Sequence, residues 1–285
     1  MSLSRRNFWL SLLGTLAAPV GIYGYMRREA SDFEVTHTDI SLSGIEKTIS
    51  ILHLSDIHSS EDVPFDLLKR AVNLAVSSCD PDFVCLTGDY KTTDFPDQAE
   101  FIETLSPISE IAPAFAIIGN HDFSPRPDGM VTFKPMLDLL RACRFDPLFN
   151  EKRIVACGDQ TLELYGLGDI WSGTCRPQNC LNRLDETEGP RPPRLVLSHN
   201  PDSKTVLQPY DWDLMLCGHT HGGQIKIPFT DIRPILPISD KAFSAGLYDW
   251  DQRKVFITRG VGNQHGLRFN CRPEISVIHL QPSNT

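Results

Sequence analysis

Five short polar motifs, spread over residues 55–223, are the feature of this sequence that most restricts its fold. Four of them directly follow runs of apolar residues of the kind that form buried strands. The motifs are Ser55-Asp56-Ile57-His58, Thr87-Gly88-Asp89, Gly119-Asn120-His121-Asp122, Ser198-His199-Asn200 and Cys217-Gly218-His219-Thr220-His221-Gly222-Gly223. Side chains at the carboxyl ends of parallel strands converge at one edge of the sheet. The pattern therefore predicts an α/β fold with one site at the carboxyl edge of a buried parallel sheet.

The first two motifs frame a strand, helix, strand unit. Residues 48–54 are dense in aliphatic side chains and are expected to form a buried strand. Pro64 can occupy the first turn of the helix that follows. The apolar residues of this helix share one face: Leu67, Leu68, Ala71, Val72, Ala75 and Val76. Residues 83–86 form the next strand, so both strands carry a polar motif at the same end, which predicts a right-handed βαβ unit.

The alternation of expected strands and helices continues along the chain. Helices are expected at 99–105 and 134–143, and strands at 114–118, 162–167, 195–197 and 214–216. Shorter strand-like segments follow residue 224, at 225–227, 255–258 and 275–280. Alternating apolar and polar residues predict an edge strand at 33–42.

The size and charge of the chain restrict its domain organisation and its partners. Its 285 residues are 41% hydrophobic, which is enough for one large core, and residues 31–285 are expected to form a single domain. The net charge of −9 argues against specific nucleic-acid binding, which normally requires a basic surface. An anionic substrate is still compatible, because bound divalent cations reverse the electric field inside a cleft.

The eight cysteines do not form a pattern typical of a disulfide scaffold in a chain of this length. Cys85 and Cys217 lie inside apolar runs and are expected to be buried. Cys175 and Cys180 lie in a polar loop, where they could pair, hold a metal or stay free. The sequence leaves these alternatives open.

Residues 1–30 have the features of a targeting segment. Arg5-Arg6 precedes a stretch, residues 7–26, that contains no charged side chain. This combination resembles a twin-arginine signal, and the stretch is also about long enough to span a bilayer as a helix. Because Ala17-Ala18-Pro19 is a poor cleavage site, a removable signal and an uncleaved anchor both stay open. The expected partners are the twin-arginine translocase and the inner membrane, with the periplasm as the destination of an exported form.

The motif side chains form a set of nitrogen and oxygen metal ligands. Asp56 and His58 can face one ion across a tight turn, and the two oxygens of Asp89 can bridge two ions. Asn120 offers a carbonyl oxygen, and three imidazoles complete the set: His199, His219 and His221. Such ligands without thiolates suit Mn, Fe or Zn, and two ions about 3.5–4 Å apart can clamp a phosphoryl group. Four glycines give the backbone room beside the ions: Gly88, Gly119, Gly218 and Gly222.

Taken together, the motifs resemble those of the calcineurin-like metallophosphoesterase family. The resemblance covers residues 48–224 and includes Asn200-Pro201-Asp202 and Gly222-Gly223-Gln224. It implies an αββα fold, in which a two-sheet β-sandwich, completed by the C-terminal strands, is flanked by helices. It also implies that one ion is held by Asp56, His58, Asp89 and His221, and the other by Asp89, Asn120, His199 and His219.

The same resemblance implies a phosphodiesterase that uses two divalent metal ions. A water bridging the ions reaches a pKa of roughly 7, and the hydroxide attacks phosphorus in line. His121 is implied as the acid that protonates the leaving group, with Asp122 orienting it, a step worth about 10²–10⁴-fold. Two alternatives stay open: a membrane-associated pyrophosphatase acting on a lipid-linked nucleotide such as UDP-2,3-diacylglucosamine, and a non-catalytic metal-bound scaffold. The complete ligand set and His121 argue against the scaffold.

Residues around this centre are harder to assign from sequence. Arg126, Arg259 and His265 are candidates for substrate binding, although Arg126 is more simply interpreted as a solvated loop arginine. Trp171 could be a substrate platform or a core residue. The sequence alone does not separate these roles.

Overall fold

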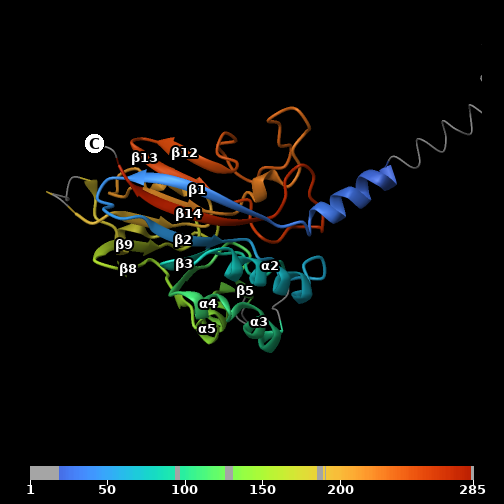
Figure 1. Cartoon of the computed structure of the whole chain (residues 1–285), viewed down its shortest axis with the longest axis horizontal. Helices are drawn as coiled ribbons and strands as arrows, with labels where there is room; N and C mark the ends of the chain where they lie inside the picture. The colour runs from blue at the N-terminus through green and yellow to red at the C-terminus, as the bar shows by residue number, and fades with distance from the viewer. Residues whose placement is uncertain (1–18, 94–96, 126–130, 185–188, 190, 284–285) are drawn as a thin grey trace, which may run out of the picture.

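The structure is a computed structural model that describes residues 19–93, 97–125, 131–184, 189 and 191–283 (Figure 1). Two six-stranded sheets stack on each other, and helices cover the outer face of the first sheet. The expected α/β fold, a two-sheet sandwich flanked by helices, is confirmed.

The first sheet has the strand order β1-β14-β2-β3-β4-β7. Its strands are β1 (Glu34–Leu42), β14 (Glu274–Pro282), β2 (Ile49–Leu54), β3 (Phe83–Thr87), β4 (Ala114–Ile117) and β7 (Asp146–Pro147). β2, β3, β4 and β7 run parallel, whereas β14 is antiparallel to β2 and parallel to the edge strand β1. The βαβ unit and the edge strand therefore lie where the sequence predicts them.

The second sheet has the strand order β12-β13-β11-β10-β9-β8. Its strands are β12 (Gly246–Trp250), β13 (Arg253–Ile257), β11 (Leu214–Cys217), β10 (Arg194–Leu197), β9 (Gln160–Gly166) and β8 (Glu151–Cys157). The four central strands run parallel, and β12 and β8 are antiparallel edges. Neither edge strand is anticipated from the sequence.

The main core lies between the two sheets. Ile51 and Phe83 of the first sheet share one buried cluster with Leu164, Leu197 and Leu216 of the second. β3, β10 and β11 are buried along their whole length. Strands covered on both faces have no solvent-facing positions, which explains why they read as continuous rather than alternating apolar runs.

Helices and short turns complete the domain. They are α2 (Phe65–Ser78), α3 (Gln98–Leu105), α4 (Ile108–Ile111), α5 (Lys134–Ala142), α6 (Ser203–Val206), η1 (Pro177–Asn179) and η3 (His221–Gly223), and a small hairpin pairs β5 (Ser124–Pro125) with β6 (Val131–Thr132). α2 begins directly after Pro64, which has an extended backbone and precedes the first turn. α3 is capped by the Asp97 carboxylate, which accepts the backbone N–H of Glu100 at 2.9 Å.

One expected strand is absent from the described structure. Residues 225–227 were expected to form a strand, but they contribute only an isolated bridge between Ile225 and Phe269. The segment lies outside both sheets, so its apolar residues have no neighbouring strand to pair with, and the prediction is wrong here. Both Cys175 and Cys180 are free thiols.

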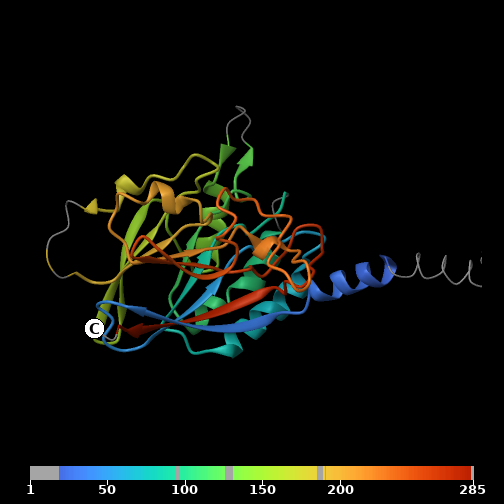
Figure 2. The same cartoon turned by 90° about the horizontal axis from the view of Figure 1, so that it is seen from above.

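A helix over residues 19–29 projects from the body of the protein in both views (Figures 1 and 2). Most of the expected targeting segment, residues 1–18, lies outside the described residues. Within the described ranges, no helix combines the length and the apolar character that a membrane crossing requires.

Candidate metal centre

The five sequence motifs meet at the carboxyl ends of strands from both sheets. Asp56, Asp89 and Asn120 follow β2, β3 and β4 of the first sheet. His199 and His219 follow β10 and β11 of the second. The site is therefore built across the open end of the sandwich, where two parallel sheets present their carboxyl edges to each other.

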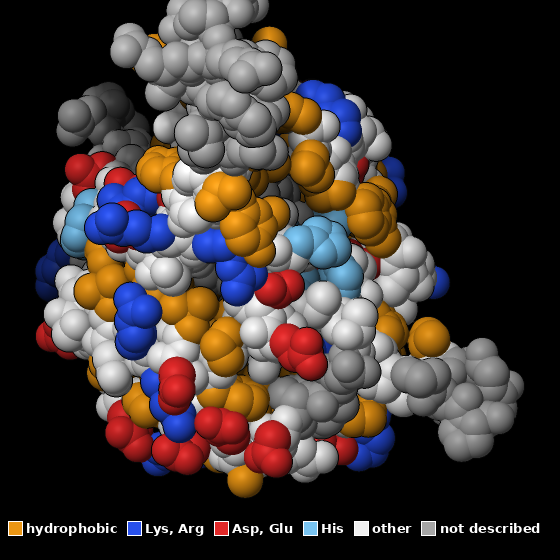
Figure 3. All heavy atoms as spheres, turned by 90° about the vertical axis from the view of Figure 1, so that its right-hand side faces the viewer, with side chains coloured by type: hydrophobic (Ala, Val, Ile, Leu, Met, Phe, Trp, Pro, Cys, Tyr) orange, Lys and Arg blue, Asp and Glu red, His pale blue; other side chains and the backbone are white. Residues whose placement is uncertain are grey.

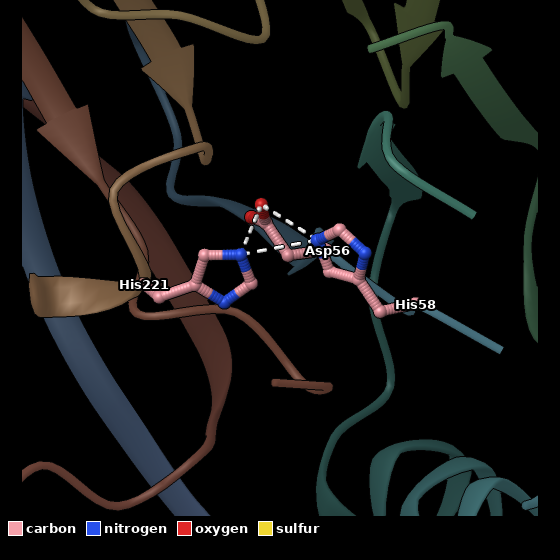
Figure 4. Close-up of side chains that lie close together, drawn as sticks. All are labelled: Asp56, His58 and His221. Carbon is pink, nitrogen blue, oxygen red and sulfur yellow. Dashed lines mark hydrogen bonds and ion pairs between the residues drawn. The ribbon is translucent and has the colours of Figure 1, made fainter. Parts of the chain in front are cut away.

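One cluster consists of Asp56, His58 and His221, whose side chains point toward one another (Figure 4). The Nε2 atoms of His58 and His221 are 3.1 Å apart, and His221 Nε2 lies 3.4 Å from Asp56 Oδ1. One ligand atom of each residue lies within 4.8 Å of the other two, and all three residues are buried. This spacing suits a single cation held between them.

A second cluster consists of Asp89, His199 and His219. His199 Nε2 lies 3.0 Å from Asp89 Oδ2, and His219 Nδ1 lies 3.3 Å from His199 Nε2. Asp89 Oδ2 is also only 3.5 Å from His58 Nε2 of the first cluster. One carboxylate is thus within reach of both clusters, as a bridging ligand must be.

Asn120 adds a neutral oxygen to this donor set. Its side-chain oxygen is buried and has no hydrogen-bond partner among the described residues. A buried polar atom without a partner is costly, and a bound cation would satisfy it. The oxygen, the imidazoles and the carboxylates form a donor set that fits divalent cations such as Mn, Fe or Zn.

The backbone at the ligands is held in an unfavourable conformation. Five of the seven predicted ligands have positive φ angles between 49° and 68°: Asp56, His58, Asp89, His219 and His221. Non-glycine residues rarely adopt this region, and each instance costs roughly 1–3 kcal/mol. Gly119 and Gly218 permit this close approach, because an added Cβ would overlap with the carboxylate of Asp89 or Asp56 respectively. The rest of the fold therefore holds the ligands in place at the expense of local backbone energy.

Backbone carbonyls orient the imidazole rings. His199 Nδ1 lies 2.7 Å from the carbonyl of Thr87, and His219 Nε2 lies 3.0 Å from the carbonyl of Pro237. A ring N–H donated to a carbonyl leaves the other nitrogen unprotonated and directed into the cluster. This is the arrangement expected of metal-ligating histidines.

Burial and mutual charge shift the pKa values of the clustered groups. Burial lowers the pKa of His58 to about 3 and that of His219 to about 4. Burial raises the pKa of Asp56 to about 6, although His199 opposes this shift. Burial also acts against the charged forms of Asp89 and His199, but their mutual attraction lowers the pKa of Asp89 and raises that of His199 to about 10. The neutral imidazoles of His58 and His219 are ready to bind a cation, whereas His199 must release its proton when a cation binds.

His121 lies beside the clusters rather than inside them. Its Nδ1 is 2.8 Å from the carbonyl of Thr92, and its Nε2 is 3.3 Å from the amide nitrogen of Gln264. Its ring centroid is 5.1 Å from that of His58. The ring is therefore close enough to serve a substrate bound at the clusters.

The contacts of Asp122 do not match its expected role of orienting His121. Its Oδ2 accepts the backbone N–H groups of Asp89 and Gly119, at 2.9 and 2.7 Å, and its Oδ1 accepts that of Tyr90 at 2.8 Å. The carboxylate therefore fixes the loop that carries Asp89, and the contact that holds His121 comes from Thr92. The family resemblance implied that Asp122 orients His121, but the two side chains have different hydrogen-bond partners in the structure.

The three candidate substrate residues have different outcomes. Arg126 lies outside the described residues. Arg259 donates to the carboxylates of Glu34 and Glu274, at 2.7 and 3.0 Å, so its guanidinium is engaged in a structural ion-pair network. His265 lines a cavity of about 550 Å³ next to His121.

Trp171 and Gln264 line the cavities beside the clusters, a role that the sequence did not establish for either residue. Trp171 is 55% exposed and meets His219 edge to face, with ring centroids 4.4 Å apart. It lines a second cavity, of about 180 Å³, together with Asn120 and Ile235. Gln264 lines both cavities, and nothing in its sequence context marked it as a site residue.

Comparison with known proteins agrees with this geometry. The family model for calcineurin-like phosphoesterases matches residues 49–223. The chain is 39% identical to phosphodiesterase YaeI of Escherichia coli over 98% of this chain and 99% of that protein. It is 31% identical to the metallophosphoesterase YkuE of Bacillus subtilis over 99% of both chains.

A more distant relative is the UDP-2,3-diacylglucosamine pyrophosphatase LpxG of Chlamydia trachomatis. It is 24% identical over 81% of this chain and 83% of that protein. The family match spans all seven predicted ligands, and the fold places them in two adjoining clusters. This chain therefore belongs to the calcineurin-like phosphoesterase family and is a metal-dependent phosphoester hydrolase.

Proposed function

We propose that this hydrolase is a phosphodiesterase that works with two divalent cations of the Mn, Fe or Zn type. The observation that carries the proposal is the arrangement of the two clusters, which share access to Asp89 and lie beside His121. Asp56, His58, Asp89 and His221 would hold one cation, and Asp89, Asn120, His199 and His219 the other. When bound, the cations supply Lewis-acid stabilisation of phosphoryl charge and activation of a water nucleophile.

The chain's own residues position the substrate and handle the proton. His121 keeps its Nδ1 paired with the carbonyl of Thr92, so its Nε2 is the atom that can hold a proton for the leaving oxygen. Gln264, 3.3 Å from this nitrogen, limits the rotation of the ring. Asp122 keeps the Asp89 loop in place through its three backbone hydrogen bonds.

The cavities support a diester rather than a monoester. His121 and Gln264 line both the 180 Å³ cavity and the 550 Å³ cavity, which therefore adjoin at the proposed proton donor. A diester has two substituents on phosphorus, and these two spaces can accept one each. Trp171, Ile235 and Pro237 give the smaller cavity an apolar wall.

A lipid-linked pyrophosphate is the second candidate substrate. A pyrophosphate linkage also carries substituents on both sides of the cleaved bond, and the apolar wall of the smaller cavity can contact an acyl or sugar-linked group. The similarity to LpxG favours this class. A non-catalytic scaffold is disfavoured, because His121 has no role in holding a cation and is nevertheless fixed beside both clusters.

We also propose that the N-terminal residues direct the protein to the inner membrane or through it by the twin-arginine route. Arg5-Arg6 and the uncharged stretch 7–26 support this location. The described helix over residues 19–29 supports it further, since it exposes Val20, Ile22 and Tyr23 to solvent. Membrane fractionation of the full chain, with and without Arg5→Lys and Arg6→Lys together, tests this placement.

The activity test is hydrolysis of bis-p-nitrophenyl phosphate by metal-stripped protein, before and after addition of Mn²⁺, Fe²⁺ or Zn²⁺. We expect turnover only after metal addition. A parallel screen of phosphomonoesters, other diesters and lipid pyrophosphates ranks the substrate classes. Absence of turnover with every metal, in protein that still binds the ions, would support the scaffold instead.

A further inference from the structure

A loop beside the site exposes an unusual amount of apolar surface. We call residues 225–235, which follow η3, the apolar loop. Four of its large hydrophobic side chains are exposed: Ile227, Phe229, Ile232 and Ile235. The side chain of Phe229 is fully exposed, and its backbone has a φ of 62°, a conformation that bulky residues rarely adopt.

The apolar loop is an ordered turn rather than an open strand end. The backbone N–H of Ile227 donates to the carbonyl of Ile232 at 3.0 Å, and that of Thr230 donates to Ile227 at 3.2 Å. The backbone N–H of Lys226 donates to the carbonyl of Phe269 at 2.8 Å, and this bond connects the base of the loop to the body of the protein. The turn therefore keeps Phe229 exposed to solvent, where its apolar side chain adds nothing to the stability of a monomer in water.

The helix over residues 19–29 lies next to this loop. The ring of Tyr25 meets the ring of Phe269 edge to face, with centroids 5.5 Å apart. Phe269 in turn exchanges backbone hydrogen bonds with Gln224 and Lys226, both at 2.8 Å. On the face toward which the helix projects, hydrophobic side chains and histidines lie among Lys, Arg, Asp and Glu side chains (Figure 3). The helix and the apolar loop thus share one side of the molecule.

No spacer separates the uncharged N-terminal stretch from the body. The stretch ends at Met26, where the charged residues Arg27 and Arg28 begin. The carbonyl of Met26 already accepts the backbone N–H of Arg268, at 3.2 Å. A bilayer that takes up the stretch must therefore lie directly against this side of the body.

The charged residues around the apolar loop are compatible with a position at the surface of a bilayer. Lys226 pairs with Asp231 at 3.0 Å, and Arg233 donates to the carbonyl of Gly222, so the basic groups lie at the base of the loop. Arg27 pairs with Asp62 at 2.9 Å. Apolar side chains at the tip with basic groups behind them are typical of segments that insert shallowly into the headgroup region, although Asp231 opposes attraction to anionic lipid.

We propose that the apolar loop inserts into the surface of a phospholipid bilayer and so opens the catalytic cavity toward that surface. Ile235, at one end of the loop, and Gln224, directly before it, both line the 180 Å³ cavity. A substrate whose phosphorus lies in the headgroup region would reach the clusters without leaving the membrane. The inference rests on the proposed membrane contact of the N-terminal stretch and does not require a particular hydrolytic activity.

Depth-dependent fluorescence quenching tests the insertion. The full chain with Phe229→Trp is reconstituted into phosphatidylcholine and phosphatidylglycerol vesicles, with or without brominated acyl chains, and the wild-type emission is subtracted. We expect brominated lipid to remove about half or more of the added emission, since interfacial segments bury side chains about 5–10 Å deep. Ile154→Trp is the matched control, because Ile154 is 69% exposed on β8, at the end of the body opposite the projecting helix (Figure 1).

Equal and negligible quenching at the two positions would overturn the proposal. A second pair of measurements uses Phe229→Ser and Ile232→Ser in the same vesicles. Hydrolysis of a vesicle-borne diester should fall several-fold, while hydrolysis of bis-p-nitrophenyl phosphate in solution stays unchanged. A shift from dimer to monomer in the Ser variants, together with no quenching of Phe229→Trp by brominated lipid, would assign the loop to contact with a second copy and contradict bilayer insertion. Because quenching does not depend on turnover, its result stands apart from the proposed activity.

Discussion

The metal-ligand edge and the rim of the cavities are built in different ways. The edge consists of the seven ligands, six of which are buried; they follow strand ends, and backbone carbonyls orient the rings of His199 and His219. The rim consists of Trp171, Ile235, Gln264 and His265, which lie in loops and have partly exposed side chains. The difference indicates that the edge carries the chemistry and is intolerant of change, whereas the rim sets which substrates enter.

The largest effect is expected at the residue that both clusters share. Asp89→Asn keeps the volume of the side chain but removes a charge that faces His58 and His199 at 3.5 and 3.0 Å. We expect the protein to lose bound metal and its turnover to fall at least about 10³-fold, since charge stabilisation in the site is lost. Metal content per chain and initial rates check this. The control is Asp159→Asn, whose carboxylate is exposed and pairs with Lys47 on the surface.

His121→Ala separates chemistry from metal binding at the boundary between edge and rim. We expect turnover to fall by about 10²–10⁴-fold, because the proton donor is removed. Metal content should stay at the wild-type level, since the ring lies outside both clusters. The fall in turnover should be smaller for substrates that have a better leaving group. Parallel loss of metal and turnover would show that His121 is itself a ligand.

Gly218→Ala tests whether the edge depends on close packing of the backbone. An added Cβ would overlap with the side chains of Ser55 and Asp56. We expect a loss of about 1–3 kcal/mol in the free energy of unfolding and weaker metal binding. Denaturant titration measures the first and metal titration the second. Gly24→Ala is the contrasting change, because nothing lies within 4 Å of its added Cβ, and it should leave both quantities near wild type.

The smallest effect is expected at the rim. Trp171→Ala removes an exposed ring that touches His219 at a centroid distance of 4.4 Å. We expect KM to rise several-fold for diesters with an aromatic or apolar substituent, with kcat and metal content nearly unchanged. Trp171→Phe should restore most of the lost affinity. A large fall in kcat would instead place Trp171 among the groups that hold His219 in position.

Much of the fold was predictable from apolar periodicity. β2, β3, β4, β10 and β11 lie where dense apolar runs end in polar motifs. The edge strands β8 and β12 were not expected, because they are only partly buried and their pattern is weak. Residues 225–227 show the opposite error, since apolar residues there stay exposed in a loop instead of pairing in a sheet.

The catalytic surroundings were less predictable than the ligands. Asp122 follows His121 in sequence, yet its carboxylate accepts backbone groups of Asp89, Tyr90 and Gly119 instead of holding the ring. Arg259 was a candidate for substrate binding, but Glu34 and Glu274, distant in sequence, engage its guanidinium. Such partners are selected by tertiary packing, which local sequence does not encode.

The sequence by itself determined the family, the donor set and the placement of each ligand at a strand end, because strand ends and ligand chemistry are local properties of short motifs. Only the tertiary structure decided that Asp89 faces both clusters, that Gln264 joins two cavities, and that the apolar loop lies beside the N-terminal helix. Those relations join segments that are far apart in the chain, such as those of Tyr25 and Phe269, and they arise from how two sheets pack and where their connecting loops meet.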